Sequence, residues 1–437
     1  MANASTASST DASTQASPLD DPEERRVLYA ALDSFRSTQT LPNHSLTFIV
    51  DRRQYRQAAH YNITHLRRQS FYSLPTAHMD ILCEPPFSVP QTFDAVDEAI
   101  DSNADISEAI LAAGLSNFST HVVDDTWKGT ATPNDVDKAR STIRQLYRDW
   151  SLEGLPERHA SHTPIIAALA EYLPSLPAAH RHRHRILVPG AGLGRLVYEL
   201  GVAGYTVEGN EISYHQLIAS NYILYGAQSA GQHKLFPWAL SFNNHLSRAN
   251  QLQSVKVPDV LPNEALAESA ERIQPEIPLR ERMIWTAGDF CALYREPRYE
   301  NAFDAVTTCF FIDTSSNVID YIETVKHTLK PDGVWVNIGP LLWHFEATPT
   351  PAATERQTSN NGSAPSTAAP GARTRAGVGK SGSVELSNDE VLALLERFEF
   401  DVLEHTQAPA GATGYIQDPH SMLQNVYQPA FWVARKR

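Results

Sequence analysis

The chain has 437 residues, 42% of them hydrophobic, so it exceeds one ordinary domain and can bury a sizeable core. Its formal net charge of −14 argues against a nucleic-acid partner held by general electrostatics. The three cysteines include no CxxC pair, which excludes a disulfide framework and a thiolate zinc site and favours a reducing compartment. There is no apolar run of about 18 residues and no signal-peptide pattern, so we expect no membrane partner and a cytoplasmic or nuclear location.

Residues 1–18 are polar and aperiodic, which predicts a disordered tail, and residues 19–180 follow a largely helical pattern. In "DDPEERRVLYAALDSFR", Asp21 is the expected cap and Pro22 the first helical residue. The apolar face of this predicted helix comprises Leu28, Leu32 and Phe35. The segment "NDVDKARSTIRQLYRDWS" predicts a second helix. Its apolar stripe comprises Val136, Ala139, Ile143, Leu146 and Trp150.

From residue 181 to 437, short apolar strands alternate with helices, which argues for an α/β fold with a parallel sheet. The expected strands are "RILVP", "TVEGNE", "FDAVTTCFFIDT", "VWVNIGPL", "FDVLEHT" and "QPAFWVARKR". We expect the helix "RLVYELGVAG" to end at Gly201 or Gly204. In "SSNVIDYIETVKHTLKPDG", the residues Val318, Ile322, Val325 and Leu329 share a face, and the Pro331–Gly333 turn stops the helix.

Three further segments have distinctive compositions. The run "HRHRHR" at 180–185 has no fixed acidic or cysteine partner nearby, so we expect a basic, solvated segment and no metal site. Residues 347–382 are rich in Ala, Thr, Ser, Pro and Gly without periodicity, which predicts a disordered insertion. Order is expected to resume at "SVELSNDEVLALLERFEF", where Ser387 and Glu390 form a capping box.

The most informative segment is "RILVPGAGLGRLVYELGVAGYTVEGNEIS", residues 185–213. Gly190, Gly192 and Gly194 follow a strand, and the acid Glu211 ends the next strand, 21 residues after the first glycine. Such a turn lets backbone N–H groups approach a ligand, and such an acid accepts hydrogen bonds from ribose hydroxyls. Arg195 stands where a dinucleotide-binding turn needs a small residue. The spacing favours an S-adenosylmethionine enzyme over a nicotinamide or flavin enzyme, or over a tight turn with no ligand.

Longer segments resemble a known family. In order, "RQLYRDWSLEG", "ILVPGAGLGRL", "GYTVEGNEIS", "TAGDF", "TCFFIDTSSNVIDYIETV", "LKPDGVWVNIGPLLWHFE", "SVELSNDEV" and "FWVARK" resemble signature segments of the carnosine N-methyltransferases. The resemblance covers roughly residues 135–437. It implies a seven-stranded class I, Rossmann-like methyltransferase sheet with a helical N-terminal region. It also implies S-adenosyl-L-methionine as cofactor and methylation of an imidazole nitrogen of carnosine, giving anserine.

Carried over by matching position, the resemblance implies a set of cofactor contacts: Gln145, Arg148, Gly190, Glu211, Asp289, Phe290 and Cys309. The predicted cofactor site also includes Gly192, Gly194 and Arg195 of the turn. For Asp289 the alternative is a loop-closing turn, and for Cys309 a small core residue. The implied substrate residues, which we also take as catalytic, are Asp313, His344 and Tyr427. Asn425 and Val426 replace neighbours of that tyrosine in the family's tyrosine-rich run, which leaves the acceptor's identity open.

The nucleophile in such a reaction is a neutral imidazole, whose ordinary pKa lies near 6.5. Asp313, after "TTCFFI", is placed to accept the imidazole's other N–H and so fix its tautomer. The alternative for Asp313 is an N-cap of the following helix. Phe310 and Phe311 are expected to alternate across the strand, with Phe310 against the substrate. His344 binds substrate or relays a proton in this interpretation, and is otherwise a core histidine.

We therefore expect an enzyme acting on a small histidine-containing peptide. The first alternative is a protein-histidine methyltransferase. The second is an S-adenosylmethionine-binding interaction module without turnover. The sequence leaves open the oligomeric state and which imidazole nitrogen is methylated.

Overall fold

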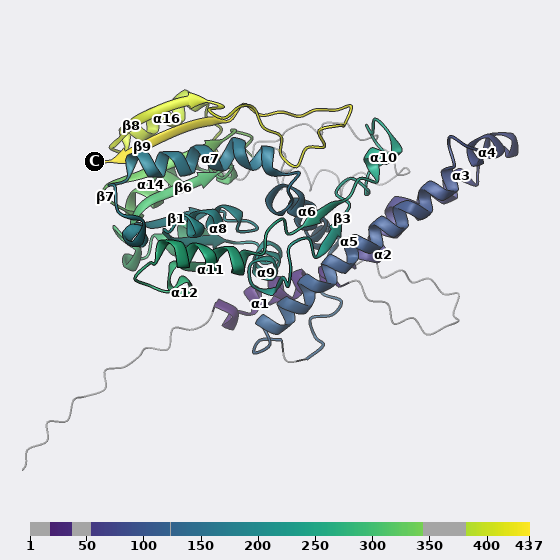
Figure 1. The fold of residues 1–437 in the computed structure, drawn as a ribbon, viewed down its shortest axis with the longest axis horizontal. Coiled ribbons are helices and arrows are strands. Elements are labelled where there is room, and N and C mark those ends of the chain that lie inside the picture. Colours follow the sequence, from purple (N-terminus) through teal and green to yellow (C-terminus); the bar gives the residue numbers. More distant parts are fainter. Residues whose placement is uncertain (1–17, 37–53, 123, 344–381) are drawn as a thin grey trace, which may run out of the picture.

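The computed structural model describes residues 18–36, 54–122, 124–343 and 382–437. Its centre is a seven-stranded sheet of order β5-β2-β1-β6-β7-β9-β8 (Figure 1). The strands are β1 Arg185–Pro189, β2 Thr206–Glu211, β5 Met283–Ala287, β6 Phe303–Cys309, β7 Leu329–Gly339, β8 Phe400–Gln407 and β9 Ala430–Lys436. Only β9 runs antiparallel to its neighbours, β7 and β8, and the other pairs are parallel. This is the Rossmann-like class I methyltransferase arrangement, so the expected fold class is confirmed.

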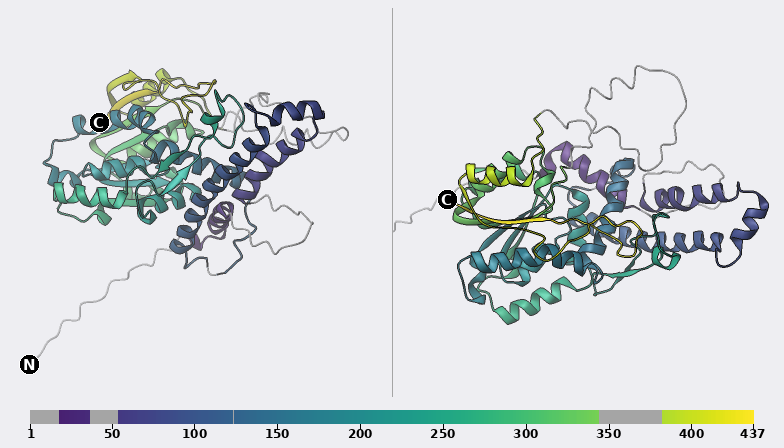
Figure 2. Two further views of the ribbon diagram at one scale, coloured as in Figure 1. Left: turned by 45° about the vertical axis from the view of Figure 1, so that its right-hand side comes forward. Right: turned by 90° about the horizontal axis from the view of Figure 1, so that it is seen from above.

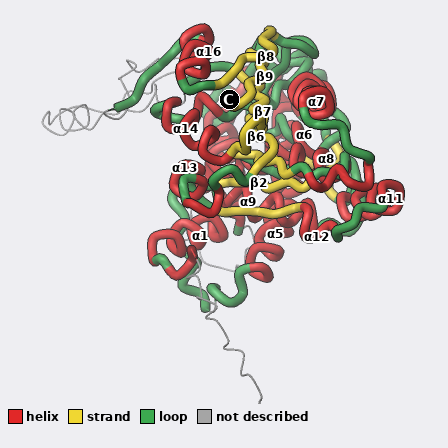
Figure 3. Tube along the Cα trace, turned by 90° about the vertical axis from the view of Figure 1, so that its left-hand side faces the viewer, coloured by secondary structure: helices red, strands yellow, loops and turns green. Residues whose placement is uncertain are grey.

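Helices cover both faces of the sheet, as Figure 3 shows with the sheet seen edge-on. One face carries α13 Phe290–Tyr294, α14 Val318–Thr328 and α16 Asn388–Arg397. The other carries α7 Leu155–Tyr172, α8 Arg195–Val202 and α11 Pro262–Ile273. The remaining elements after β2 are α9 Tyr214–Asn221, β3 His233–Leu235, α10 Arg248–Gln251, β4 Val255–Val257 and α12 Leu279–Arg282. Strands β3 and β4 form a separate antiparallel pair.

All described elements before Ala178 are helical. The helices that precede α7 are α1 Pro22–Phe35, α2 Tyr55–Ala59, α3 Leu66–Phe71, α4 Thr76–Cys83, α5 Val89–Asn117 and α6 Pro133–Trp150. Helix α5 runs out from the body, and α3 and α4 lie at its far end (Figures 1 and 2). Helices α1 and α6 share one hydrophobic cluster with the sheet, including Leu28, Ile143, Ile186 and Val207. The helical region therefore packs on the sheet through a continuous core.

Local sequence signals account for several element boundaries. The Asp21 side chain accepts the Glu23 N–H at 2.8 Å and caps α1, as predicted. Ser387 and Glu390 form the predicted capping box of α16. The predicted apolar faces of α1 and α6 are buried, with Leu28, Leu32, Phe35, Ala139, Leu146 and Trp150 at 0% exposure.

Three expectations need correction or refinement. Helix α8 ends before Gly204, which has a left-handed φ of 97°, whereas Gly201 lies inside the helix. Leu329 does not extend the face of α14, because the helix ends at Thr328 and Leu329 pairs with Phe303 of β6. The expectation of a solvated histidine run is wrong for two of its members. His182 and His184 are each 7% exposed. Their rings lie 2.8 Å from the carbonyl oxygens of Ala179 and Pro174.

Some predictions fall outside the described residues: the tail up to residue 17, the insertion up to residue 381, and His344. The division into a helical region and a sheet domain stays a prediction. Within the described ranges, no helix has both the length and the apolar character needed to cross a membrane. The same residues include no group of three or more potential metal ligands.

Candidate active site

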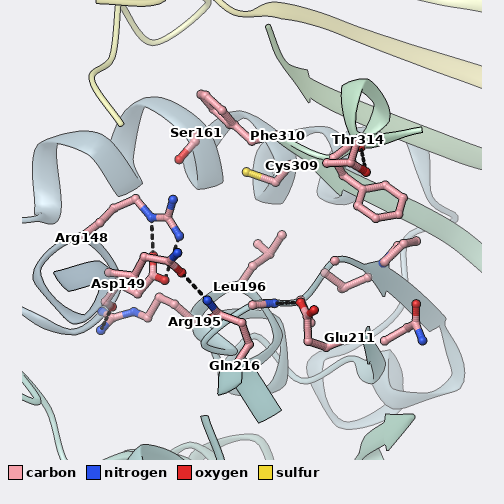
Figure 4. Close-up of a pocket in the computed structure, with 18 of the residues that line it drawn as sticks. Arg148, Asp149, Ser161, Arg195, Leu196, Glu211, Gln216, Cys309, Phe310 and Thr314 are labelled. Carbon is pink, nitrogen blue, oxygen red and sulfur yellow. Dashed lines mark hydrogen bonds and ion pairs between the residues drawn. The ribbon is translucent and has the colours of Figure 1, made fainter. Parts of the chain in front are cut away.

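A cavity of about 500 Å³ lies at the carboxyl ends of β1, β2, β5 and β6 (Figure 4). Ligands of open α/β sheets bind at this edge, where the strand order reverses. Most of the predicted site residues line it, namely Gln145, Arg148, Gly190, Gly192, Arg195, Glu211, Asp289, Phe290, Cys309 and Phe310. Gly194, Asp313 and Tyr427 are not among the lining residues. The cavity therefore gathers side chains from segments far apart in the chain.

The glycine turn connects β1 to α8 with left-handed backbone at all three glycines. At Gly190, an added Cβ would lie 2.4 Å from the Phe311 ring, so glycine is required for space as well as for its φ of 65°. Gly194 precedes α8, and an added Cβ would meet the Trp285 ring at 2.9 Å. At Gly190 and Gly192 the turn thus brings backbone, and not side chains, to the cavity wall.

Glu211 ends β2 and is only 8% exposed. Its Oε2 accepts the Gly192 N–H at 2.9 Å, and its Oε1 accepts the N–H groups of Ile212 at 2.9 Å and Ser213 at 2.8 Å. Burial raises the pKa of Glu211, and these three hydrogen bonds oppose that rise. A carboxylate has about four acceptor positions, so one remains available to a ligand hydroxyl.

The loop after β5 adds a second acid and an aromatic ring. The Asp289 side chain accepts the Ala292 N–H at 2.8 Å and caps α13. Asp289 therefore makes the loop-closing contact that was the alternative to a cofactor-binding role. It also lines the cavity. Phe290 is 4% exposed, and its ring packs edge-on against Phe311 and Tyr321. Phe290 therefore belongs to an aromatic, apolar wall beside the Asp289 acceptor, which is suited to a heteroaromatic base.

Helix α6 supplies a polar wall beside the glycine turn. Gln145 accepts a hydrogen bond from Gln216 at 2.8 Å. Arg148 pairs with Asp149 at 2.6 Å, and its guanidinium lies 4.7 Å from the centre of the Tyr415 ring. Gln145 and Arg148 are three residues apart, so both reach the same cavity from one helix face.

Arg195 lines the cavity, but its guanidinium is held by acids. It contacts Glu199 at 2.8 Å and Asp259 at 2.7 Å. Glu199 also lies 2.8 Å from the ring of His162, a cavity-lining residue of α7. Burial disfavours the charged imidazole, but Glu199 and a hydrogen bond to Cys309 outweigh it and raise the pKa of His162 to about 9. Burial of Glu199 is likewise outweighed by His162 and Arg195, which lower its pKa to about 2.

The segment after β6 forms the other end of the cavity. The expectation that Phe310 and Phe311 alternate in the strand is wrong, because β6 ends at Cys309 and Phe310 has a left-handed φ of 53°. Its N–H still bonds to the Ile338 carbonyl at 2.8 Å, which continues the ladder with β7 one residue past the end of β6. A left-handed phenylalanine is strained, and such strain concentrates at functional sites.

Asp313 is buried, at 2% exposure, in a short 3₁₀ turn. Its Oδ2 accepts the Leu342 N–H at 2.9 Å. It does not cap the following helix, because Asn317 is the N-cap of α14 and its side chain accepts the Ile319 N–H. Thr314, the next residue, lines the cavity. Asp313 is therefore next in the chain to a lining residue, and its proposed catalytic role stays a prediction.

Tyr427 reaches the same end of the cavity through aromatic contacts. The Phe310 ring lies 6.0 Å from Tyr427 and 5.6 Å from Tyr415. The backbones of Thr413 and Tyr427 form an antiparallel bridge within the loop between β8 and β9. The N–H groups of Ile416 and Gln417 in this loop both donate to the Glu157 carboxylate of α7 at 2.8 Å.

Sequence reasoning missed several lining residues, among them Glu157, Ser161, His162, Asn210, Gln216, Tyr321 and Tyr415. Asn210 directly precedes Glu211 in β2, so the glycine–acid motif could have indicated it. The others come from α7, α9, α14 and the β8–β9 loop. No local pattern marks them, because only the tertiary fold brings these elements to the sheet edge.

Comparison with known proteins identifies the family of the chain. A family model described as carnosine N-methyltransferase matches residues 125–437. The carnosine N-methyltransferase of Schizosaccharomyces pombe is 33% identical over 382 residues, covering 87% of this chain and 92% of that protein. The mouse (Mus musculus) carnosine N-methyltransferase is 38% identical and covers 67% of this chain and 69% of its own length. A solved phosphoethanolamine N-methyltransferase 2 from Haemonchus contortus shares 13% identity over 68% of this chain and 57% of that chain, with a TM-score of 0.35. The chain belongs to the carnosine N-methyltransferase family.

Proposed function

We propose that the chain is an S-adenosylmethionine-dependent N-methyltransferase acting on an imidazole nitrogen of carnosine or a related histidine-containing dipeptide. One observation carries the proposal. A single cavity has the Glu211–Gly192 pair on one wall and Phe310 on another, and it is also lined by Cys309 at the end of β6. Membership in a family whose relatives are named for methylation of carnosine supports the choice of acceptor.

The lining residues fit this cofactor. Glu211 retains an acceptor position for a ribose hydroxyl, and Gly192 keeps the turn free of side chains. Phe290 and Asp289 provide a ring face and an acceptor for adenine. Arg148 offers a cation to the methionine carboxylate. When bound, the cofactor supplies an electrophilic methyl group on a sulfonium.

The chain's contribution to the reaction is chiefly orientation. The acceptor imidazole, with an ordinary pKa near 6.5, is largely neutral at pH 7, so no strong base is needed. One nitrogen must be bare and the other must carry the proton. The Asp313 carboxylate, fixed by the Leu342 N–H, accepts that second N–H and stabilises the cationic product. Holding two reactants in line in this way is worth several kcal/mol, up to roughly 7–11.

Aromatic rings complete the acceptor end. Phe310, Tyr415 and Tyr427 form one cluster, with ring centres 5.6 and 6.0 Å from Phe310. These rings offer the planar imidazole an apolar surface and exclude water from the transfer. They also stabilise the positive charge that the imidazole acquires, by cation–π interaction of about 0.5–2 kcal/mol.

The test is a methyl-transfer assay with labelled S-adenosylmethionine and purified protein, offering carnosine, free histidine and a lysate of proteins. We expect label on carnosine, with the product identified as a ring-methylated dipeptide by mass spectrometry. Label on lysate proteins alone would move the acceptor to a larger partner. Calorimetry with S-adenosylhomocysteine run in parallel separates a protein that binds cofactor without turnover from one that binds nothing.

A further inference from the structure

A second cavity, of about 590 Å³, adjoins the first and shares Tyr415 with it. The two cavities are built from the same two segments. Helix α6 presents Arg148 to the first cavity and Arg144, one turn earlier, to the second. The β8–β9 loop presents Thr413 to the first and Asp418 to the second. An acceptor whose imidazole lies against Phe310 therefore extends past Tyr415 into the second cavity.

The second cavity contains a buried carboxylate oxygen that lacks a donor. Asp418 is 5% exposed and lines the cavity. Its Oδ1 accepts the His420 N–H at 2.9 Å and the Asn250 side chain at 3.3 Å. Its Oδ2 is buried and has no hydrogen-bond partner in the part of the chain that the structure describes. A buried carboxylate oxygen is costly unless a donor or a cation reaches it.

His245 contributes a second acceptor to the same cavity. Its Nε2 lies 2.8 Å from the Ser241 carbonyl oxygen, which only accepts, so Nε2 carries the proton. With the proton on Nε2, Nδ1 is the acceptor of the ring, and among the described residues it has no partner. Two acceptors without donors in one cavity call for a ligand with several N–H groups, and an ammonium has three.

The cavity also contains a cation. The Arg144 guanidinium donates to the Ile416 carbonyl oxygen at 3.0 Å and lies 5.1 Å from the centre of the Trp238 ring. A guanidinium has five N–H donors in a planar fork that matches a carboxylate. Arg140 lines the cavity as well, but it is engaged by Asp137 at 2.9 Å. Arg144 is therefore the cation best placed for an anionic ligand group.

We propose that the second cavity binds the charged backbone of the acceptor peptide, with Arg144 taking its carboxylate and Asp418 with His245 taking its terminal ammonium. This rests on the proposed function, because the imidazole end lies in the first cavity. Arg144 and Asp418 are then specificity-determining residues that select short histidine peptides with a free amino group and a free carboxylate.

The test compares four acceptors: carnosine, N-acetylcarnosine without the ammonium, carnosine amide without the carboxylate, and 4-methylimidazole without either. Binding is measured by calorimetry in the presence of S-adenosylhomocysteine, and kcat/KM by labelled methyl transfer. For the wild type we expect a loss of about 10-fold or more for each charge removed, as for hydrogen bonds to charged groups.

Two variants locate the loss. Asp418→Asn keeps the shape and the Oδ1 contacts, so it should weaken carnosine about 10-fold while leaving N-acetylcarnosine unchanged. Arg144→Gln should erase the preference for carnosine over its amide, and Arg144→Lys should restore part of it. Lys138→Gln, on the same helix and outside both cavities, is the matched control and should change no ratio.

The relative affinities for the four acceptors distinguish ligand recognition by Arg144 from its support of the β8–β9 loop. Arg144 also holds Ile416, so a merely structural role would weaken all four acceptors equally and leave every ratio intact. That result, or equal use of all four acceptors by the wild type, overturns the inference while the methyltransferase function stands. If the protein binds the four acceptors with different affinities but methylates none of them, the proposed function is wrong and the binding site stands. No binding of any acceptor would overturn the inference directly.

Discussion

Glu211 and Gly192 form one unit: the carboxylate that ends β2 accepts the N–H of the middle glycine in the turn after β1, at 2.9 Å. The neighbouring strand ends are thereby tied together at the edge where ligands bind. The acid is buried, and the backbone rather than a cation stabilises it. Its orientation is consequently fixed before any cofactor arrives.

Glu211→Gln should weaken cofactor binding about 10-fold or more. A glutamine that keeps its carbonyl toward Ile212 and Ser213 turns an NH₂ group toward the Gly192 N–H, so two donors meet. Calorimetry with S-adenosylhomocysteine measures the loss. Glu208→Gln on the same strand is the matched control, because that buried acid contacts Tyr294 and does not line the cavity. If wild type and Glu211→Gln bind S-adenosylhomocysteine equally well, Glu211 does not contact the cofactor.

The glycine turn offers a matched pair of variants. Gly190→Ala would place a Cβ 2.4 Å from the Phe311 ring, whereas Gly192→Ala would meet no atom closer than 4.0 Å. Both residues have positive φ, which costs roughly 1–2 kcal/mol for alanine. Urea unfolding should show Gly190→Ala less stable than Gly192→Ala by a further 1–3 kcal/mol, about the cost of overpacking. Equal stabilities would mean that Phe311 moves aside freely.

Glu157 holds the β8–β9 loop over the cavity by accepting the N–H groups of Ile416 and Gln417. Glu157→Ala should raise the KM for the acceptor several-fold, because Tyr415 and Tyr427 lose their support. Hydrogen exchange at residues 413–427 should become faster. Glu153→Ala, at a nearby exposed acid, serves as the control. Unchanged exchange in Glu157→Ala would show that the loop is held by other contacts.

The His162–Glu199 pair predicts a pH dependence of stability. Because the pKa of His162 is raised from 6.5 to about 9, its contribution is full below pH 6.5 and is lost as the pH rises through about 9. The pKa of Glu199 is lowered from 4.5 to about 2, so its contribution is full above pH 4.5 and is lost toward pH 2.

His162→Gln should therefore lower the melting temperature at pH 6 more than at pH 9.5. Thermal melts across this pH range give the difference in melting temperature between wild type and His162→Gln. Groups that titrate equally in both proteins do not contribute to this difference. His159→Gln, at an exposed position of the same helix, should shift the melting temperature little at either pH. A shift for His162→Gln that is the same at both pH values would contradict a charged histidine.

The presence of an α/β sheet and most strand positions follow from the sequence, because alternating apolar segments and capping residues are local signals. Asp21, Ser387 and the glycine turn are examples in which one residue type has one favoured backbone role. The glycine–acid spacing also predicted correctly that both ends of the motif face one cavity.

The acceptor end was harder to predict. Phe310 has the residue type of a strand, yet β6 ends one residue before it and its φ is positive, although its N–H still bonds to the Ile338 carbonyl of β7. His162 and Tyr415 reach the site from α7 and from the β8–β9 loop, which no sequence spacing connects to the motif. Arg195 was expected at the cofactor from its place in the turn, but its guanidinium is engaged by Glu199, one turn along α8, and by the distant Asp259.

The central claim is that Asp313 acts on the acceptor and Glu211 on the cofactor. The most direct test measures methyl transfer to carnosine and S-adenosylhomocysteine affinity side by side in wild type and Asp313→Asn. Asparagine keeps an oxygen for the Leu342 N–H but loses the charge that orients the imidazole. We predict that kcat falls at least about 100-fold while the cofactor Kd changes less than about 2-fold. A parallel loss of cofactor binding, or full activity on carnosine, would contradict the account.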